Sequence, residues 1–201
     1  MKLSTRELVI VAVFGTLWGI AEMSLGTVLK SLNIPMSGLV LSTIGLTVAM
    51  IGRVFVPKRG ATLFVGVIAM LLKLFSLGGV VLGPMIGIIS EALLAELVLS
   101  LGGKPRRALF VIAGAVGTLW PLIQPFITGP LLFGQSLFTT WLNLLDTGSR
   151  LMGIGTDAIF VILLGMIAVH LLIGIVAGVI AWDLGRLLQI RMDGSYREAY
   201  Q

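Results

Sequence analysis

The sequence lacks cysteine and has few charged residues. Charged side chains make up 11% of the 201 residues and hydrophobic ones 57%, whereas a soluble domain carries about 25% charged residues. The absence of cysteine excludes a disulfide framework, a thiolate nucleophile and a cysteine-ligated metal site. Because the mean hydropathy is also high, at +1.09, the composition indicates an integral membrane protein.

Motifs of catalysis and of nucleotide binding are absent as well. The chain has one histidine and no H-E-x-x-H pair, no G-x-S-x-G elbow and no Walker A sequence. A membrane enzyme acting on a lipid would need clustered acids, bases or metal ligands, and the acidic residues here are scattered. The net charge of +5 does not indicate nucleic-acid binding, because the basic residues form no single patch. We therefore expect no catalytic residue, no metal, no cofactor and no nucleic-acid partner.

The positions of the basic residues predict an orientation in a membrane. All but three of the 14 basic residues fall on alternate connections between apolar stretches. Short cytoplasmic loops carry an excess of lysine and arginine, so the pattern predicts cytoplasmic termini and an even number of spans. It assigns the three exceptions to the outer half: Lys30, Lys73 and Arg150.

Six apolar stretches agree with that even number. A bilayer core needs about 20 apolar residues per helix, and several of the stretches are slightly shorter. The first stretch lacks an A-x-A-like cleavage site, so we expect it to be a retained span rather than a signal peptide. We predict an all-α integral membrane protein, a six-helix transmembrane bundle that forms one domain over residues 1–201. The spans are predicted at residues 8–25, 38–56, 61–77, 84–101, 108–128 and 157–184.

Prolines occur near the predicted outer end of the fifth span, and aromatic residues occur in the segment between the fifth and sixth spans. Pro121 and Pro125 should kink the fifth span and free backbone carbonyls near its outer end. A long outer segment follows, and its centre, residues 135–145, is amphipathic with Phe138 and Trp141. That centre is either an interfacial helix or lid or an anchor in the aromatic belt of the membrane.

Ionisable residues inside the predicted spans are functional hypotheses, because burying them in lipid is costly. Lys73 and Glu91 lie near the outer ends of consecutive antiparallel spans, at similar depth. They would either neutralise each other or bind the two ends of a polar solute. Glu96 lies about 140° around the helix from Glu91, so the two do not form an acid–base dyad, and Glu96 is expected to contact a neighbouring helix. Snorkelling to the membrane surface would explain Glu22.

Five further polar or aromatic residues are candidates for solute contact. Trp120 and Gln124 are one turn apart, so an indole and an amide on one face would suit a flat heteroaromatic ligand; packing of the tryptophan against other helices is the alternative. His170 stands alone in the sixth span, where a helix–helix hydrogen bond is favoured over metal ligation. Asn143 and Asp146 lie on the outer segment and are either solute contacts or solvated.

Small residues recur at helical spacing in the first and sixth spans. Ala12, Gly15 and Gly19 form one stripe, which Glu22 and Gly26 continue. The sixth span carries a second stripe: Gly174, Gly178, Ala181 and Gly185. Such stripes let helix backbones approach closely in lipid. The partner helix can belong to this chain or to another protein.

Several stretches together resemble a known family over nearly the whole chain. They are Lys58-Arg59-Gly60-Ala61, Gly83-Pro84-Met85, Glu91-Ala92-Leu93-Leu94-Ala95-Glu96, and the end of the sixth span from Gly174 to Arg186. With six spans, cytoplasmic termini and small residues in the first span, the chain resembles the substrate-binding S component of an energy-coupling factor (ECF) vitamin transporter. The layout is similar to members linked to thiamine or its pyrimidine precursor.

The resemblance implies a function and partners. An S component binds its vitamin on the outer side of a prokaryotic plasma or inner membrane, beneath loops that close over it. It docks on a transmembrane coupling protein that is driven by two cytoplasmic ATPases. Family members dock through an A-x-x-x-A motif in the first span, where this chain reads Ala12-Val13-Phe14-Gly15-Thr16 and Gly15-x-x-x-Gly19. This departure puts the docking face, expected at Ala12, Gly15 and Gly19, in question. The alternative is a structural or assembly subunit held by its small-residue faces.

Overall fold

Helices form all the regular secondary structure in the part of the chain that the computed structural model describes, which is residues 3–76, 81–102 and 104–199. The prediction of an all-α fold is therefore confirmed for these residues. In chain order the helices are α1 (Thr5–Ser31), α2 (Ser37–Phe55), α3 (Ala61–Lys73), α4 (Leu82–Leu101), α5 (Arg107–Gly117), α6 (Trp120–Phe133), α7 (Leu137–Met152) and α8 (Ile159–Ala199).

Five helical segments are long and apolar enough to cross a membrane. They are α1, α2, α4, the consecutive pair α5–α6, and α8. The third predicted span is shorter than expected, because α3 has 13 residues and extends only about 20 Å at 1.5 Å per residue. A bilayer core is about 30 Å thick. The described residues therefore show five segments of spanning length and one short apolar helix.

The fifth predicted span is broken next to its first proline. α5 ends at Gly117 and α6 begins at Trp120, so the helical path is interrupted at Thr118 and Leu119. Pro121 has no N–H to donate to the carbonyl four residues earlier, and it occupies the first turn of α6. The interruption agrees with the predicted effect of Pro121, whereas Pro125 lies inside α6 without interrupting it. The Thr118 hydroxyl bridges to α8 by donating to the backbone oxygen of His170 at 2.8 Å.

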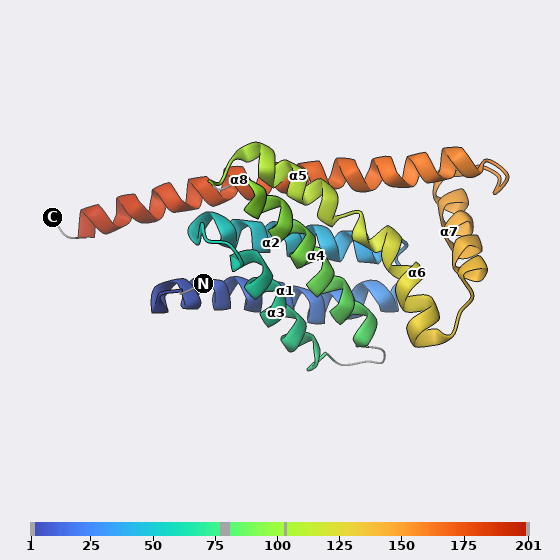
Figure 1. Cartoon of the computed structure of the whole chain (residues 1–201), viewed down its shortest axis with the longest axis horizontal. Helices are drawn as coiled ribbons and strands as arrows, with labels where there is room; N and C mark the ends of the chain where they lie inside the picture. The colour runs from blue at the N-terminus through green and yellow to red at the C-terminus, as the bar shows by residue number, and fades with distance from the viewer. Residues whose placement is uncertain (1–2, 77–80, 103, 200–201) are drawn as a thin grey trace.

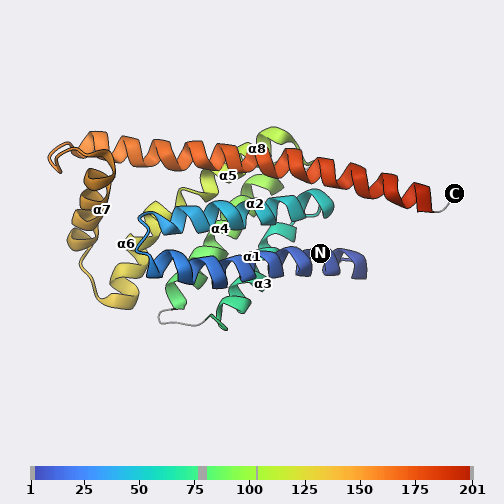
Figure 2. The ribbon, with the colours of Figure 1, turned by 180° about the vertical axis from the view of Figure 1, so that it is seen from behind.

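The segment after α6, predicted to lie on the outer side, contains a capped helix. The Ser136 hydroxyl accepts a hydrogen bond from the Thr139 N–H at 3.0 Å and so caps the start of α7. α7 lies across one end of the bundle, steeply inclined to α8 (Figures 1 and 2). α8 continues well past residue 184, the predicted end of the sixth span, and projects beyond the other helices (Figure 2).

Glycines set the closest helix contacts. A Cβ added at Gly15 would lie 2.7 Å from Ile68 Cβ, and one at Gly19 would lie 2.7 Å from Leu72 Cδ1, both on α3. Gly174 of α8 lies against the backbone of α5 in the same way. Both small-residue stripes therefore face helices of this chain. Of the three predicted docking residues, Gly15 and Gly19 are covered by α3, and Ala12 is exposed.

A core of α1 to α4 forms around Trp18. Its side chain is fully buried, and the indole occupies the space that a side chain at Gly45 of α2 would need. Ala69 of α3 and Ala92 of α4 belong to the same buried cluster. This close packing fixes α1, α2, α3 and α4 relative to one another.

The start of α3 is held by a carboxylate from α4. Glu96 accepts hydrogen bonds from the backbone N–H groups of Gly60 at 2.7 Å and Thr62 at 3.0 Å, and it forms an ion pair with Arg53 at 3.4 Å. Gly60 has a φ of 86°, which favours glycine because it has no Cβ. Glu96 thus contacts a neighbouring helix, as predicted. It satisfies free amides at the α3 N-terminus and fixes the helix that carries Lys73 at its far end.

Candidate functional site

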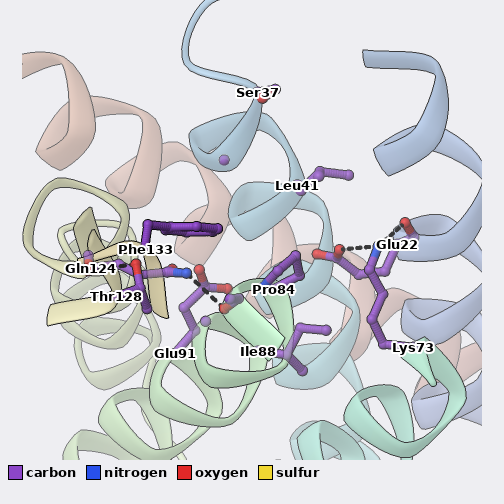
Figure 3. A pocket seen from close by; sticks show the side chains of 13 residues that line it. Glu22, Ser37, Leu41, Lys73, Pro84, Ile88, Glu91, Gln124, Thr128 and Phe133 are labelled. Atoms are coloured by element: carbon purple, nitrogen blue, oxygen red, sulfur yellow. Dashed lines mark hydrogen bonds and ion pairs between the residues drawn. The ribbon is translucent and has the colours of Figure 1, made fainter. Parts of the chain in front are cut away.

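A pocket of about 300 Å³ opens between the starts of α2 and α4, with α1, α3 and α6 completing its walls (Figure 3). This volume is at the lower end of the range for small-molecule sites. Two carboxylates, one ammonium group and one amide share it. The lining residues are Glu22, Ser37, Gly38, Leu41, Lys73, Gly83, Pro84, Gly87, Ile88, Glu91, Gln124, Thr128 and Phe133.

The ammonium group of Lys73 is held by α1. Its Nζ donates to the backbone oxygen of Glu22 at 2.6 Å and lies 3.4 Å from Glu22 Oε2, with both side chains buried. A Cβ at Gly26 would lie 3.1 Å from this Nζ, so the glycine leaves room for the ammonium beside the helix backbone. Of the two alternatives for Lys73 and Glu91, the described residues do not show the mutual ion pair: α3 packs along α1, and that packing brings Lys73 to Glu22.

Glu91 is the second carboxylate of the pocket. Its side chain is 5% exposed and comes from α4, on the opposite side of the pocket from α1 (Figure 3). Among the described residues, no ion pair includes Glu91, whereas Glu22 is paired with Lys73. With both carboxylates ionised, the pocket therefore carries one excess negative charge.

Gln124 reaches the pocket from α6 and has a fixed orientation. Its Nε2 donates to the backbone oxygen of Gly83 at 2.8 Å. A Cβ at Gly87 would lie 2.7 Å from Gln124 Oε1, so the absence of a side chain there makes room for the amide. No described group donates to Oε1. Trp120, predicted to share the site, does not line the pocket; its buried Nε1 has no hydrogen-bond partner in the described part of the chain.

The remaining predicted site residues lie elsewhere. Asn143 and His170 line a second pocket, of about 230 Å³, beneath α7. His170 is 2% exposed, and its Nδ1 is 2.8 Å from the backbone oxygen of Met166. Asp146 lies outside both pockets and pairs with Arg150 at 2.9 Å on the exposed side of α7. Within residues 3–76, 81–102 and 104–199, no three histidine or acidic side chains are grouped as metal ligands would be.

Glu22 is the pocket residue that sequence reasoning missed. It was assigned to snorkelling, yet it is 5% exposed and faces Lys73. A signal for it was present: Glu22 continues the stripe of Gly15, Gly19 and Gly26. A stripe that faces a neighbouring helix buries every residue on it, so a carboxylate there needs a partner from that helix.

The pocket thus combines the Lys73–Glu22 ion pair, a carboxylate that belongs to no ion pair among the described residues, and an amide, within mostly apolar walls. Such a set can fix the orientation of a small polar molecule by hydrogen bonds and charge. Comparison with protein-family models, with curated protein sequences and with solved structures found no match for this chain.

Proposed function

We propose that this chain is the solute-binding membrane subunit of an uptake transporter of the energy-coupling factor type, and not an enzyme. The observation that carries the proposal is the 300 Å³ pocket, in which Glu22, Lys73 and Glu91 are all buried. Ionisable side chains within apolar helices are expensive to maintain and mark solute or ion sites in membrane proteins. The Lys73–Glu22 pair accounts for two of these groups and leaves Glu91 to meet a ligand.

The pocket defines the chemistry of the solute. Glu91 calls for a cation or for N–H and O–H donors, whereas Gln124 Oε1 can accept one further hydrogen bond. The volume suits a molecule of one or two rings. Thiamine or its pyrimidine precursor, which the sequence resemblance suggests, would offer amino N–H groups to Glu91.

Six spans with cytoplasmic termini fit this function. The start of α1 and the end of α8 lie toward the same end of the bundle, and α7 lies at the opposite end (Figure 1). The pocket is lined by the starts of α2 and α4, away from the buried Arg53–Glu96 pair at the start of α3. In the proposed topology α3 is a short span that brings the number of spans to six. The pocket opens outward, and the chain lies in a prokaryotic plasma or inner membrane.

A transmembrane coupling protein and two cytoplasmic ATPases complete the proposed transporter. Since Gly15 and Gly19 are covered by α3, docking would use the exposed side of α1, which carries Ala12, Val13 and Leu17. The alternative, a structural or assembly subunit, has less support because both small-residue stripes are used inside the chain.

Mass spectrometry of small molecules that copurify with the protein tests the proposal. It is followed by calorimetric titration of the emptied protein with thiamine and with the aminopyrimidine precursor. We expect one of these solutes to bind, and the Glu91→Gln variant to bind it at least about tenfold more weakly, because a charge-assisted hydrogen bond contributes about 1.5–3 kcal/mol.

The matched control is Glu7→Gln, which makes the same change at the start of α1, in a glutamate that pairs with Lys58 and does not line the pocket. This variant should bind with unchanged affinity below its unfolding temperature. Repeated absence of any copurified or added solute would contradict the transport function and favour the assembly alternative.

A further inference from the structure

The second pocket, beneath α7, has its own set of lining residues. It lies between the start of α2, the proline-containing part of α6, α7 and α8. Its walls are mainly apolar, including Leu122, Phe126, Leu144 and Met166. An apolar cavity of about 150 Å³ holds one benzene molecule, so a pocket of about 230 Å³ has room for a single ring with a small substituent.

One buried side chain gives this pocket a directional polar group. His170 Nδ1 lies 2.8 Å from the Met166 backbone oxygen, and a carbonyl oxygen only accepts, so Nδ1 carries the proton. In a neutral imidazole, Nε2 is then a hydrogen-bond acceptor. None of the described residues hydrogen-bonds to Nε2, although the residue is 2% exposed and lines the pocket.

The other hydroxyls near this pocket are already used. Thr140 Oγ1 donates to the backbone oxygen of Ser136, and Thr147 Oγ1 donates to that of Asn143. Asn143 is exposed and lines the pocket, so its amide lies where the pocket meets solvent. Among the described side chains of this pocket, the free hydrogen-bonding groups are therefore one acceptor in the interior and two amides, Asn143 and Gln135, at the exposed side.

We infer that the pocket beneath α7 is a second ligand site, which takes a small, mainly apolar ring compound carrying one O–H or N–H donor that His170 Nε2 accepts. Such a ligand donates to the free acceptor Nε2, and its ring replaces water against the apolar walls. The compound class is that of simple phenols and of ring amines of similar size.

This site is separate from the pocket that holds Glu91. Among the described residues, Gly38 alone lines both pockets, and their other lining residues differ. Binding beneath α7 does not depend on the transport function proposed above.

Two matched probes test the site: 4-fluorophenol, which has a donor, and 4-fluoroanisole, which has none. The full chain in lipid nanodiscs is titrated with each and followed by ¹⁹F NMR, with empty nanodiscs measured to subtract partition into lipid. We expect the phenol to bind at least about fivefold more tightly than the ether, since one net hydrogen bond corresponds to about that ratio. Equal affinities for the two probes would overturn the inference.

Two variants test whether the His170 imidazole causes the preference for the phenol over the ether. His170→Leu should remove the difference between the two probes, and Asp146→Asn, on the exposed side of α7, should leave it unchanged. A preference that survives in His170→Leu would also overturn the inference.

A diazirine-bearing phenol gives a second measurement on the unaltered protein, which is needed if His170→Leu does not fold. Labels are expected on the peptides around Asn143 and Met166. Labels confined to α1, α3, α4 or α5, which do not line this pocket, would contradict the site.

Discussion

Removing the ammonium group of Lys73 is the most informative perturbation of the first pocket. Lys73→Met keeps an unbranched side chain of similar length and deletes the positive charge. The substitution leaves Glu22 and Glu91 as two buried carboxylates in one pocket and removes the ion pair that Glu22 forms with Lys73. It also leaves the backbone oxygen of Glu22 without the hydrogen bond at 2.6 Å.

The expected cost follows from the distances. Two unit charges at the observed 3.4 Å attract each other by about 5 kcal/mol at an effective dielectric constant of about 20. Removing one partner of a buried pair typically costs about 3–5 kcal/mol. A carboxylate can take up a proton when its partner is lost, which limits the penalty. We therefore expect Lys73→Met to lower the free energy of unfolding by about 3 kcal/mol.

Double-mutant cycles identify the partner of Lys73. The free energy of unfolding is measured by equilibrium SDS titration in mixed micelles for Lys73→Met, Glu22→Gln, Glu91→Gln and the two double variants. The coupling energy between Lys73 and Glu22 should be about 2 kcal/mol, within the range for residues in contact. The coupling between Lys73 and Glu91 should be less than half of that. A larger coupling with Glu91, or a cost of Lys73→Met below about 1 kcal/mol, would refute the assignment.

Three other substitutions test the geometry around the site. Glu96→Gln should lower the free energy of unfolding by about 2 kcal/mol, because an amide cannot replace the charge-assisted bonds at the start of α3; an unchanged SDS midpoint would contradict this. Gly15→Leu should destabilise the isolated chain by at least about 2 kcal/mol through overpacking against Ile68, and loss of partner binding without loss of stability would instead restore Gly15 as a docking residue. Gly87→Ala should displace the Gln124 amide and weaken solute binding, and adding Gln124→Ala to this variant should weaken binding no further. Additive effects of the two substitutions in the calorimetric titration would show that the two residues act independently.

Properties that depend on one segment at a time were predictable from the sequence. The all-helical class follows from long apolar stretches. The break at Thr118 follows from the missing N–H of Pro121, and the glycine stripes of α1 and α8 mark close contacts. Each of these depends on residue type and helical period, which the sequence displays directly.

The neighbouring helix that each of these faces contacts could not be predicted from the sequence in the same way. Helical periodicity shows that Gly15 faces a neighbour, but it does not show that this neighbour is α3 rather than another protein. Lys73 and Glu91 were matched by depth alone, whereas the structure brings Lys73 to Glu22 because α3 lies along α1. Depth fixes one coordinate of a side chain, and its direction around the helix axis and the neighbour it meets depend on how all the helices pack.

The sequence by itself determined that the chain is helical, apolar and asymmetric in its basic residues, and it marked Lys73, Glu91 and Gln124 as candidates. Only the tertiary structure decided that these three share a pocket with Glu22, that Trp120 is excluded from it, and that His170 belongs to a second pocket beneath α7. The physical reason is that residue type and period act locally along one helix, whereas a pocket is the space left by several helices whose packing is set by contacts far apart in the chain.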